Sequence, residues 1–228
     1  MKKIQRVAAV GAMAALTAVI GACSNAQGPA GQGAPAPAPA SEAAPASSAA
    51  ATPSSGKTEI KDIFGPACSQ VPAEGPGSAQ GMVNDPVATA ASHNPLLTTL
   101  TAAVTAANLG DTLNSAEGIT VFAPYDGAFK ALEAKNPGTI KQLTTAPDVA
   151  SPNSKLAKIL TYHVVGTRYN AAGIVAAGTL PSLEGGKIVI GGTEAAPTVN
   201  GNKVLCGNIP TKNATVFVID GVLSPPAT

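Results

Sequence analysis

Apolar residues recur at helical spacing in one long stretch near the middle of the chain. The positions that lie three or four residues apart on one face are Leu96, Leu97, Leu100, Val104 and Ala107. Asn94 and Pro95 stand just before this run, and both are favoured at the start of a helix. Gly110 follows the run and is typical of a helix end. The pattern therefore predicts a helix that begins at Asn94 and Pro95 and ends before Gly110.

Shorter helical patterns follow this long one. A second helix start stands at 151–152, a Ser-Pro pair, and the apolar residues that share one face after it are Leu156, Ile159 and Leu160. Asp126 is expected to cap a short helix at 127–133, because aspartate accepts hydrogen bonds from the free N–H groups of a first turn. Residues 170–177 form another short helical pattern, which a glycine ends.

Short β-prone runs are bounded by glycine and proline, mostly in the last quarter of the chain. One run, 119–123, lies between the predicted helices and ends at a proline. The others are 180–183, 187–190, 198–199, 203–206 and 214–220. Asn200-Gly201 is a strong hairpin signal, and the sequence leaves open whether that loop extends through Asn202. Helices come first and strands follow, which favours an α+β fold over repeated βαβ units.

The N-terminus has the pattern of an export signal. Residues 1–6 are positively charged, 7–20 are apolar, and two small residues precede Cys23. The apolar run is too short to span a bilayer, which needs about 20 residues. We therefore expect a signal peptide at 1–22. Residues 20–23, Ile-Gly-Ala-Cys, resemble a bacterial lipobox, which implies cleavage before Cys23 and attachment of a diacylglyceryl lipid to its thiol.

Lipidation has one alternative, an ordinary signal peptide with an incidental Cys23. If the lipid is present, its two or three acyl chains, such as palmitate, hold the protein stably to the membrane. Residues 23–57 hold six prolines, no aromatic residue and a single acid, Glu42. Such a segment buries too little apolar surface to offset its ordering entropy, so we expect a disordered tether. The folded domain is then predicted at 58–228.

Charge and motif content argue against several function classes. Removing Lys2, Lys3 and Arg6 from 14 basic residues leaves 11 against 13 acidic ones, a net charge of −2. No basic patch is visible, so nucleic acid is not an expected partner. The folded part has no phosphate loop, dinucleotide fingerprint or nucleophile elbow, and its two histidines have no metal-ligand spacing. We expect no cofactor, no metal and no enzyme activity.

Two cysteines are left when Cys23 is assigned to lipid. In an exported protein, Cys68 and Cys206 are a disulfide candidate with one possible connectivity. The bond would join the two ends of the predicted domain. The alternative is a pair of buried free thiols.

Several segments together resemble the fasciclin (FAS1) family. Residues 120–129, Thr-Val-Phe-Ala-Pro-Tyr-Asp-Gly-Ala-Phe, are similar to its first signature. Residues 160–165 contain its Tyr-His segment, and 213–223 are similar to its closing signature. The surroundings of both cysteines and of residues 111–115 are similar to secreted mycobacterial members. The resemblance covers about 60–226, and it departs from the family at Tyr125, where Ser or Thr is usual.

This resemblance carries expectations for fold and function. It implies a single FAS1 domain, a wedge-like β-sandwich of short strands with helices packed around it. It also implies adhesion or another surface interaction, with a protein or glycan partner on the envelope or on a host surface, and antigenicity. In mycobacterial lipoproteins of this kind, the implied partners include host matrix molecules and lipoprotein-sensing receptors. The expected location is the extracytoplasmic face of the membrane, with or without release from the cell.

The signature residues have structural interpretations beside functional ones. The Tyr-His pair is implicated in cell binding in some animal members. His163, however, shares an apolar helix face with Leu156 and Leu160, so we expect it to be buried and hydrogen-bonded to Asp126 or to nearby backbone. Asp220, in the closing signature, is assigned a structural role. Tyr162, next to His163 and directed elsewhere, is expected to be exposed and is the candidate interaction residue.

Three functions are therefore in competition. The leading one is a lipid-anchored interaction module of the cell surface. The second is a binding protein for a small apolar ligand, held in a cleft between helices and strands. The third is an envelope hydrolase, which would need a convergent Ser/His pair, with His163 as the histidine, or an Asp/Glu pair, and the sequence reveals neither.

Overall fold

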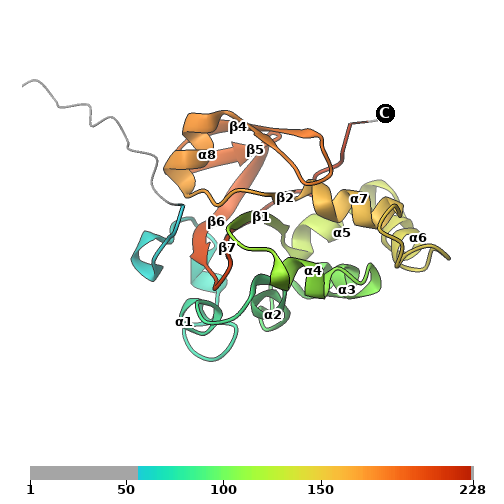
Figure 1. Ribbon diagram of the computed structural model, residues 1–228, viewed down its shortest axis with the longest axis horizontal. Helices are drawn as coiled ribbons and strands as arrows, with labels where there is room; N and C mark the ends of the chain where they lie inside the picture. Colours follow the sequence, from blue (N-terminus) through green and yellow to red (C-terminus); the bar gives the residue numbers. More distant parts are fainter. Residues whose placement is uncertain (1–55, 227–228) are drawn as a thin grey trace, which may run out of the picture. The chain divides into compact units, whose positions relative to one another are not determined.

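The computed structural model of the protein describes residues 56–226, and Figure 1 shows how their elements are arranged. The predicted signal peptide, the predicted lipid site at Cys23 and residues 24–55 lie outside the described residues. Within 56–226, no helix is long and apolar enough to cross a membrane. The described part begins at Gly56, two residues before the boundary expected from the sequence, and Gly56 is buried there.

Seven strands form one sheet in the described domain, and this sheet is nearly closed. Its order is β2-β1-β7-β6-β5-β4-β3, and only β1 and β7 run parallel. A bridge between Val165 and Ser182 connects the two edges. The strands are β1 Ile119–Pro124, β2 Val164–Val165, β3 Thr179–Pro181, β4 Lys187–Thr193, β5 Ala196–Val199, β6 Asn202–Pro210 and β7 Ala214–Ile219.

Two hydrophobic cores lie on opposite faces of the central strands. Side chains alternate across a strand, and every residue of β1 and β7 is buried, so each strand serves both cores. Val121 and Val216 belong to the first core, which the helices cover. Phe122 and Phe217 belong to the second, where their ring centroids lie 5.8 Å apart. This double burial explains why β1 and β7 are continuous apolar runs.

Eight α-helices complete the described domain, together with two short 3₁₀ helices at Ile60–Asp62 and Cys68–Gln70. The α-helices are α1 Ala79–Met82, α2 Val87–Ser92, α3 Thr98–Ala106, α4 Gly110–Ser115, α5 Asp126–Lys135, α6 Thr139–Thr144, α7 Lys155–Tyr162 and α8 Ala171–Ala177. Figure 1 shows α8 lying by β4 and β5, while α3 to α7 gather on the side of β1 and β2. The α+β class expected from the sequence is confirmed.

Some helix boundaries differ from the sequence prediction. The long helix starts at Thr98 instead of Pro95, because the Asn94 side chain accepts the N–H of Leu96 in a local turn (3.0 Å). It ends at Ala106, followed by Asn108 with a φ of 54°, a left-handed conformation that stops a helix. Gly110 therefore opens α4 and does not end α3. Helices α1, α2, α4 and α6 and the short strand β2 were not predicted.

The other predicted elements are close to those observed. Helix α7 begins after Ser154, whose hydroxyl accepts the N–H of Ala157, so the 151–152 pair lies one turn too early. The hairpin loop consists of Asn200 and Gly201 alone, because Val199 already pairs with Asn202. Both loop residues have positive φ values, 48° and 80°, as the favoured two-residue hairpin turn requires.

The N-terminal part of the described chain is tied to the sheet. The predicted disulfide is confirmed: Cys68 and Cys206 are bonded, and their Cα atoms are 5.0 Å apart. Phe64 forms a bridge with Gly207, next to the bonded cysteine of β6. Gly56 contributes at the other end, since its carbonyl oxygen accepts the hydroxyl of Thr215 (2.9 Å).

Candidate functional site

His163 is buried between the two cores, and both of its ring nitrogens are occupied. Its side chain is 3% exposed. Nδ1 lies 2.7 Å from the carbonyl oxygen of Ile159, and Nε2 accepts the N–H of Leu223 at 2.9 Å. Burial lowers the pKa of His163 to about 4, although the bond to Ile159 acts in the opposite direction. The imidazole is therefore neutral near pH 7 and joins α7 to the C-terminal segment.

Asp126 does not reach His163 and does not cap its own helix. Its carboxylate accepts the hydroxyl of Thr98 (2.6 Å) and the N–H of Thr99 (2.8 Å), so it caps α3 from 27 residues away. Burial raises the pKa of Asp126, but the hydrogen bonds from Thr98 and Thr99 outweigh it and bring the pKa below its ordinary value. The predicted cap is real, but it belongs to a different helix.

The expected exposure of Tyr162 is wrong, because its side chain is 2% exposed. The ring lies in the second core, and its hydroxyl donates to the carbonyl oxygen of Lys187 (2.7 Å). The same hydroxyl accepts from Nδ2 of Asn200 (2.9 Å). At the end of α7, His163 follows Tyr162 at about 100° around the helix axis, so the two side chains point in different directions. Tyr162 offers no surface to a partner.

Two other titratable groups of residues 56–226, Asp220 and His93, contact neighbouring groups. Oδ1 of Asp220 accepts the N–H of Lys203 (2.8 Å), which secures the end of β7 to β6. His93 faces Asp85 at 3.7 Å on the surface. Among residues 56–226, no group of three His, Cys, Asp or Glu residues could hold a metal ion.

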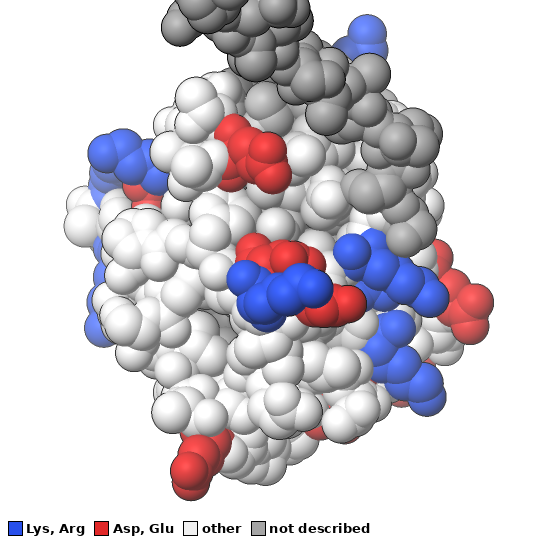
Figure 2. Space-filling view, turned by 90° about the vertical axis from the view of Figure 1, so that its left-hand side faces the viewer, with Lys and Arg blue, Asp and Glu red and all other residues white. Residues whose placement is uncertain are grey.

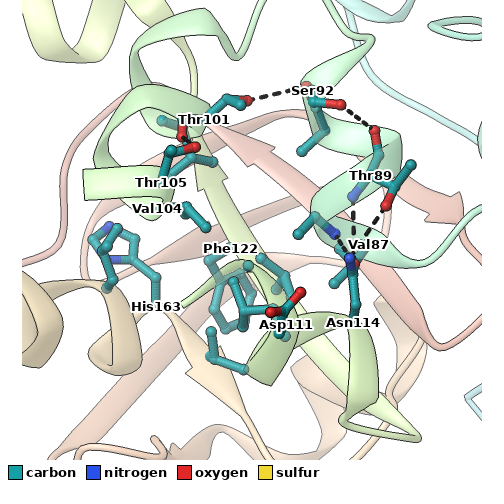
Figure 3. Close-up of a pocket in the computed structure, with 18 residues that line it drawn as sticks. Val87, Thr89, Ser92, Thr101, Val104, Thr105, Asp111, Asn114, Phe122 and His163 are labelled. Carbon is teal, nitrogen blue, oxygen red and sulfur yellow. Dashed lines mark hydrogen bonds between the residues drawn. The ribbon is translucent and has the colours of Figure 1, made fainter. Parts of the chain in front are cut away.

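One candidate site is a pocket between α2, α3 and α4, with β1 as its floor. Its volume is about 250 Å³. Figure 3 shows Phe122 between His163 on one side and the α2 residues on the other. Apolar side chains that line it include Val87, Leu100, Val104, Leu113, Val121 and Phe122. Threonine, serine, aspartate and asparagine residues of the three helices also line it.

Two buried or half-buried amides hold the walls of this pocket together. Asn213 accepts the N–H of Val87 through Oδ1 (2.8 Å), while its Nδ2 donates to carbonyl oxygens at the end of α4. Asn114 accepts the N–H of Ala88 (2.9 Å) and donates to the hydroxyl of Thr89 (3.2 Å). These bonds fix α2 against α4, so the pocket is built into the fold. No sequence pattern pointed to this pocket, because α2 was not predicted.

A smaller pocket lies on the other side of Leu160 and His163, which line both spaces. It has a volume of about 160 Å³ and is formed by α3, α5, α6 and α7. Lys155 lines it, in contrast to the first pocket, which no lysine or arginine lines.

On the surface, two large apolar side chains lie on or beside the β3–β4 hairpin. Leu183 is 51% exposed and Val189 is 57% exposed. Ile188 and Ile190 are buried, so alternation along β4 directs Val189 outward. This alternation was readable in the sequence, although the signature motifs drew the prediction to Tyr162. Elsewhere, the face in Figure 2 carries charges of both signs separated by large uncharged areas.

Comparison with known proteins identifies the family. The model of the fasciclin domain matches residues 95–225. The chain belongs to the fasciclin (FAS1) family. It is 45% identical over 174 residues to the immunogenic protein MPB70 of Mycobacterium bovis, an alignment that covers 73% of this chain and 84% of that protein. It is 44% identical over 174 residues to the M. bovis cell surface glycolipoprotein MPB83, covering 73% and 74%.

A solved structure confirms the FAS1 fold independently. It is a FAS1 domain pair from the insect cell adhesion molecule fasciclin I, with a TM-score of 0.54 and 18% sequence identity. The match covers 65% of this chain and 52% of that one, so the chain spans about half of the domain pair. At this identity the likeness concerns the fold alone. The single FAS1 domain expected from the sequence motifs is thereby confirmed.

Proposed function

We propose that this FAS1 protein is a lipid-anchored interaction module on the extracytoplasmic face of the bacterial envelope. The observation that carries the proposal is the 44% identity to a protein named as a cell surface glycolipoprotein. The predicted export signal at 1–22 and the lipobox-like cysteine, Cys23, agree with that location. The identity to a protein named as immunogenic supports antigenicity as well.

A binding role accounts better for the described side chains than catalysis does. His163, the histidine that a hydrolase would need, is neutral and has both nitrogens bonded to backbone groups. It has no free nitrogen to act as a general base. The Asp126 carboxylate is likewise engaged in capping α3. These groups hold the domain together, which leaves its surface for function.

The partner we propose is a protein, and its contact face includes the outward side of the β3–β4 hairpin. Sugars are often held by stacking on exposed aromatic rings. All seven aromatic residues of the chain lie within 56–226, and each is buried or half-buried. Leu183 and Val189 are instead exposed aliphatic side chains. Covering such side chains with a partner removes apolar surface from water and so stabilises the complex.

The test is capture of protein partners by the chain from residue 23 onward, carrying Cys23→Ser so that no lipid causes adsorption. Envelope extract and host matrix and cell-surface fractions serve as sources. We expect one saturable protein partner, whose affinity falls about tenfold when Leu183→Ser and Val189→Ser are combined. Ile60→Ser is the matched control, because Ile60 is 40% exposed but lies outside the hairpin.

Two results would contradict this proposal. The absence of any saturable protein from all sources would exclude the interaction role. A partner that binds the double variant and the Ile60→Ser control equally well would exclude the hairpin as its contact face.

A further inference from the structure

The pocket between α2, α3 and α4 has few polar groups left to bind a ligand. The hydroxyls of Ser92, Thr101 and Thr105 donate to backbone carbonyl oxygens of α2 and α3. The hydroxyl of Thr89 already accepts from Asn114. His163 is also fully bonded. Most of the wall therefore presents apolar surface, and any ligand must bind mainly through an apolar body.

One charged group lines the pocket, the carboxylate of Asp111. It lies in the first turn of α4, it is exposed, and no residue within 56–226 forms an ion pair or side-chain hydrogen bond with it. Asp111 and Asn114 both come from α4 and line the pocket (Figure 3). No lysine or arginine lines the pocket, so nothing there neutralises an anionic head group. A ligand with an amine or hydroxyl head matches this charge, whereas a carboxylate opposes it.

We propose that this pocket binds a small amphiphile with an apolar body and an amine or hydroxyl head that meets Asp111. A dry cavity of about 150 Å³ suffices for benzene. At about 250 Å³, this pocket accommodates a body of about one ring and a short chain. The site goes beyond the surface interaction proposed above, since it lies among the helices and does not use the β3–β4 hairpin.

Three probes of one shape test the ligand class: phenylpropylamine, phenylpropanol and phenylpropanoate. Binding to the Cys23→Ser chain is followed by titration of its amide NMR signals. We expect saturable binding of the amine and the alcohol, with the shifts concentrated in α2, α3 and α4. The carboxylate should bind about threefold more weakly than the amine, a difference of the size that one exposed charge pair provides.

Two substitutions locate the site. Asp111→Asn should weaken the amine about threefold and leave the alcohol unchanged. Ala88→Leu places a larger side chain in the wall and should abolish binding of both probes. Ala102→Leu is the matched control, because Ala102 is exposed on α3 and outside the pocket lining, and it should bind as the unsubstituted chain does. Thermal unfolding of each variant confirms that it is folded.

Each contrary result overturns the proposal. The pocket is not a ligand site if none of the probes saturates, or if folded Ala88→Leu binds as well as Ala102→Leu. The proposed head group is wrong if phenylpropanoate binds as tightly as the amine. If Ala88→Leu does not fold, the shifts of the unsubstituted chain decide, because movements outside α2, α3 and α4 exclude this pocket. None of these readouts involves the proposed protein partner. Failure to find that partner would therefore leave the ligand-binding results unchanged.

Discussion

Tyr162 and His163 show how neighbouring residues of a signature motif serve the interior of the domain. The Tyr162 hydroxyl joins α7 to β4 and to the Asn200 turn, and the His163 ring joins α7 to the C-terminal segment. Their polar atoms are all paired within the protein. At this scale, the residues that carry the family resemblance stabilise the fold, and recognition must come from other side chains.

His163 predicts a pH dependence of stability. The folded chain keeps this imidazole neutral down to a pKa of about 4, whereas the unfolded chain takes up a proton below about 6.5. The unfolded state therefore binds more protons between these values, and stability falls as the pH falls. The full contribution is about 3 kcal/mol, present above pH 6.5 and lost towards pH 4. Urea unfolding across this range measures it.

The control for this prediction is His163→Gln, which removes the titrating group. This variant should be less stable at pH 7 and should lose less stability than the unsubstituted chain between pH 6.5 and 4. Parallel curves for the two proteins would show that His163 does not titrate as its burial requires.

Tyr162→Phe should lower the free energy of unfolding and leave partner binding unchanged. The substitution removes the hydroxyl from Lys187 and Asn200, at a cost of about 1–2 kcal/mol. Denaturant unfolding measures the change. Tyr125→Phe is the control, because the Tyr125 hydroxyl makes no hydrogen bond within 56–226. Reduced capture of a partner at unchanged stability would restore Tyr162 as a contact residue.

At the scale of elements, the sequence predicted what local chemistry specifies and missed what distant residues supply. The Asn200-Gly201 turn and the Asn170 cap of α8 follow from adjacent residues. The first was predicted as a hairpin and the second as the start of a helix. The start of α3 depends on Asp126, which is distant in sequence, so the local Asn94-Pro95 signal misplaced it. Helix α2 depends in the same way on Asn114 and Asn213.

The candidate sites follow the same division. The disulfide could be predicted, because only two cysteines remained to form it. The burial of His163 could be predicted from its helix face. The pocket could not, since its walls meet only when α2 packs on α4. The exposure of Val189 could be predicted from strand alternation, but the exposure of Leu183 depends on the turn that follows β3.

Asp126→Ala tests the cap of α3. Loss of the bonds to Thr98 and Thr99 should cost about 1 kcal/mol in thermal or urea unfolding. Asp126→Asn keeps an acceptor and should cost less. Because the folded pKa of Asp126 is lowered, its contribution is present above its ordinary pKa and is lost as the pH falls through the folded value. Equal stability of Asp126→Ala and the unsubstituted chain would contradict this role.

At the scale of the whole molecule, the disulfide connects residues that are 138 positions apart. It ties the segment that follows the predicted tether to β6, so a force on the N-terminus would reach the sheet through a covalent bond. Combining Cys68→Ala with Cys206→Ala should cost about 2–4 kcal/mol, measured by urea unfolding of the Cys23→Ser chain. Alkylation of that chain without reductant should find no free thiol. Two modified thiols would contradict the bond.

The central claim is that a lipid on Cys23 holds this FAS1 domain on the outer side of the envelope. Protease shaving of intact bacterial cells that produce the full chain tests it most directly, with a cytoplasmic protein as the control for lysis. We expect the domain to be cleaved from intact cells, and a Cys23→Ser chain to leave the cells and appear in the medium. A full-length domain that stays protected on intact cells and is cleaved only after lysis would contradict the account.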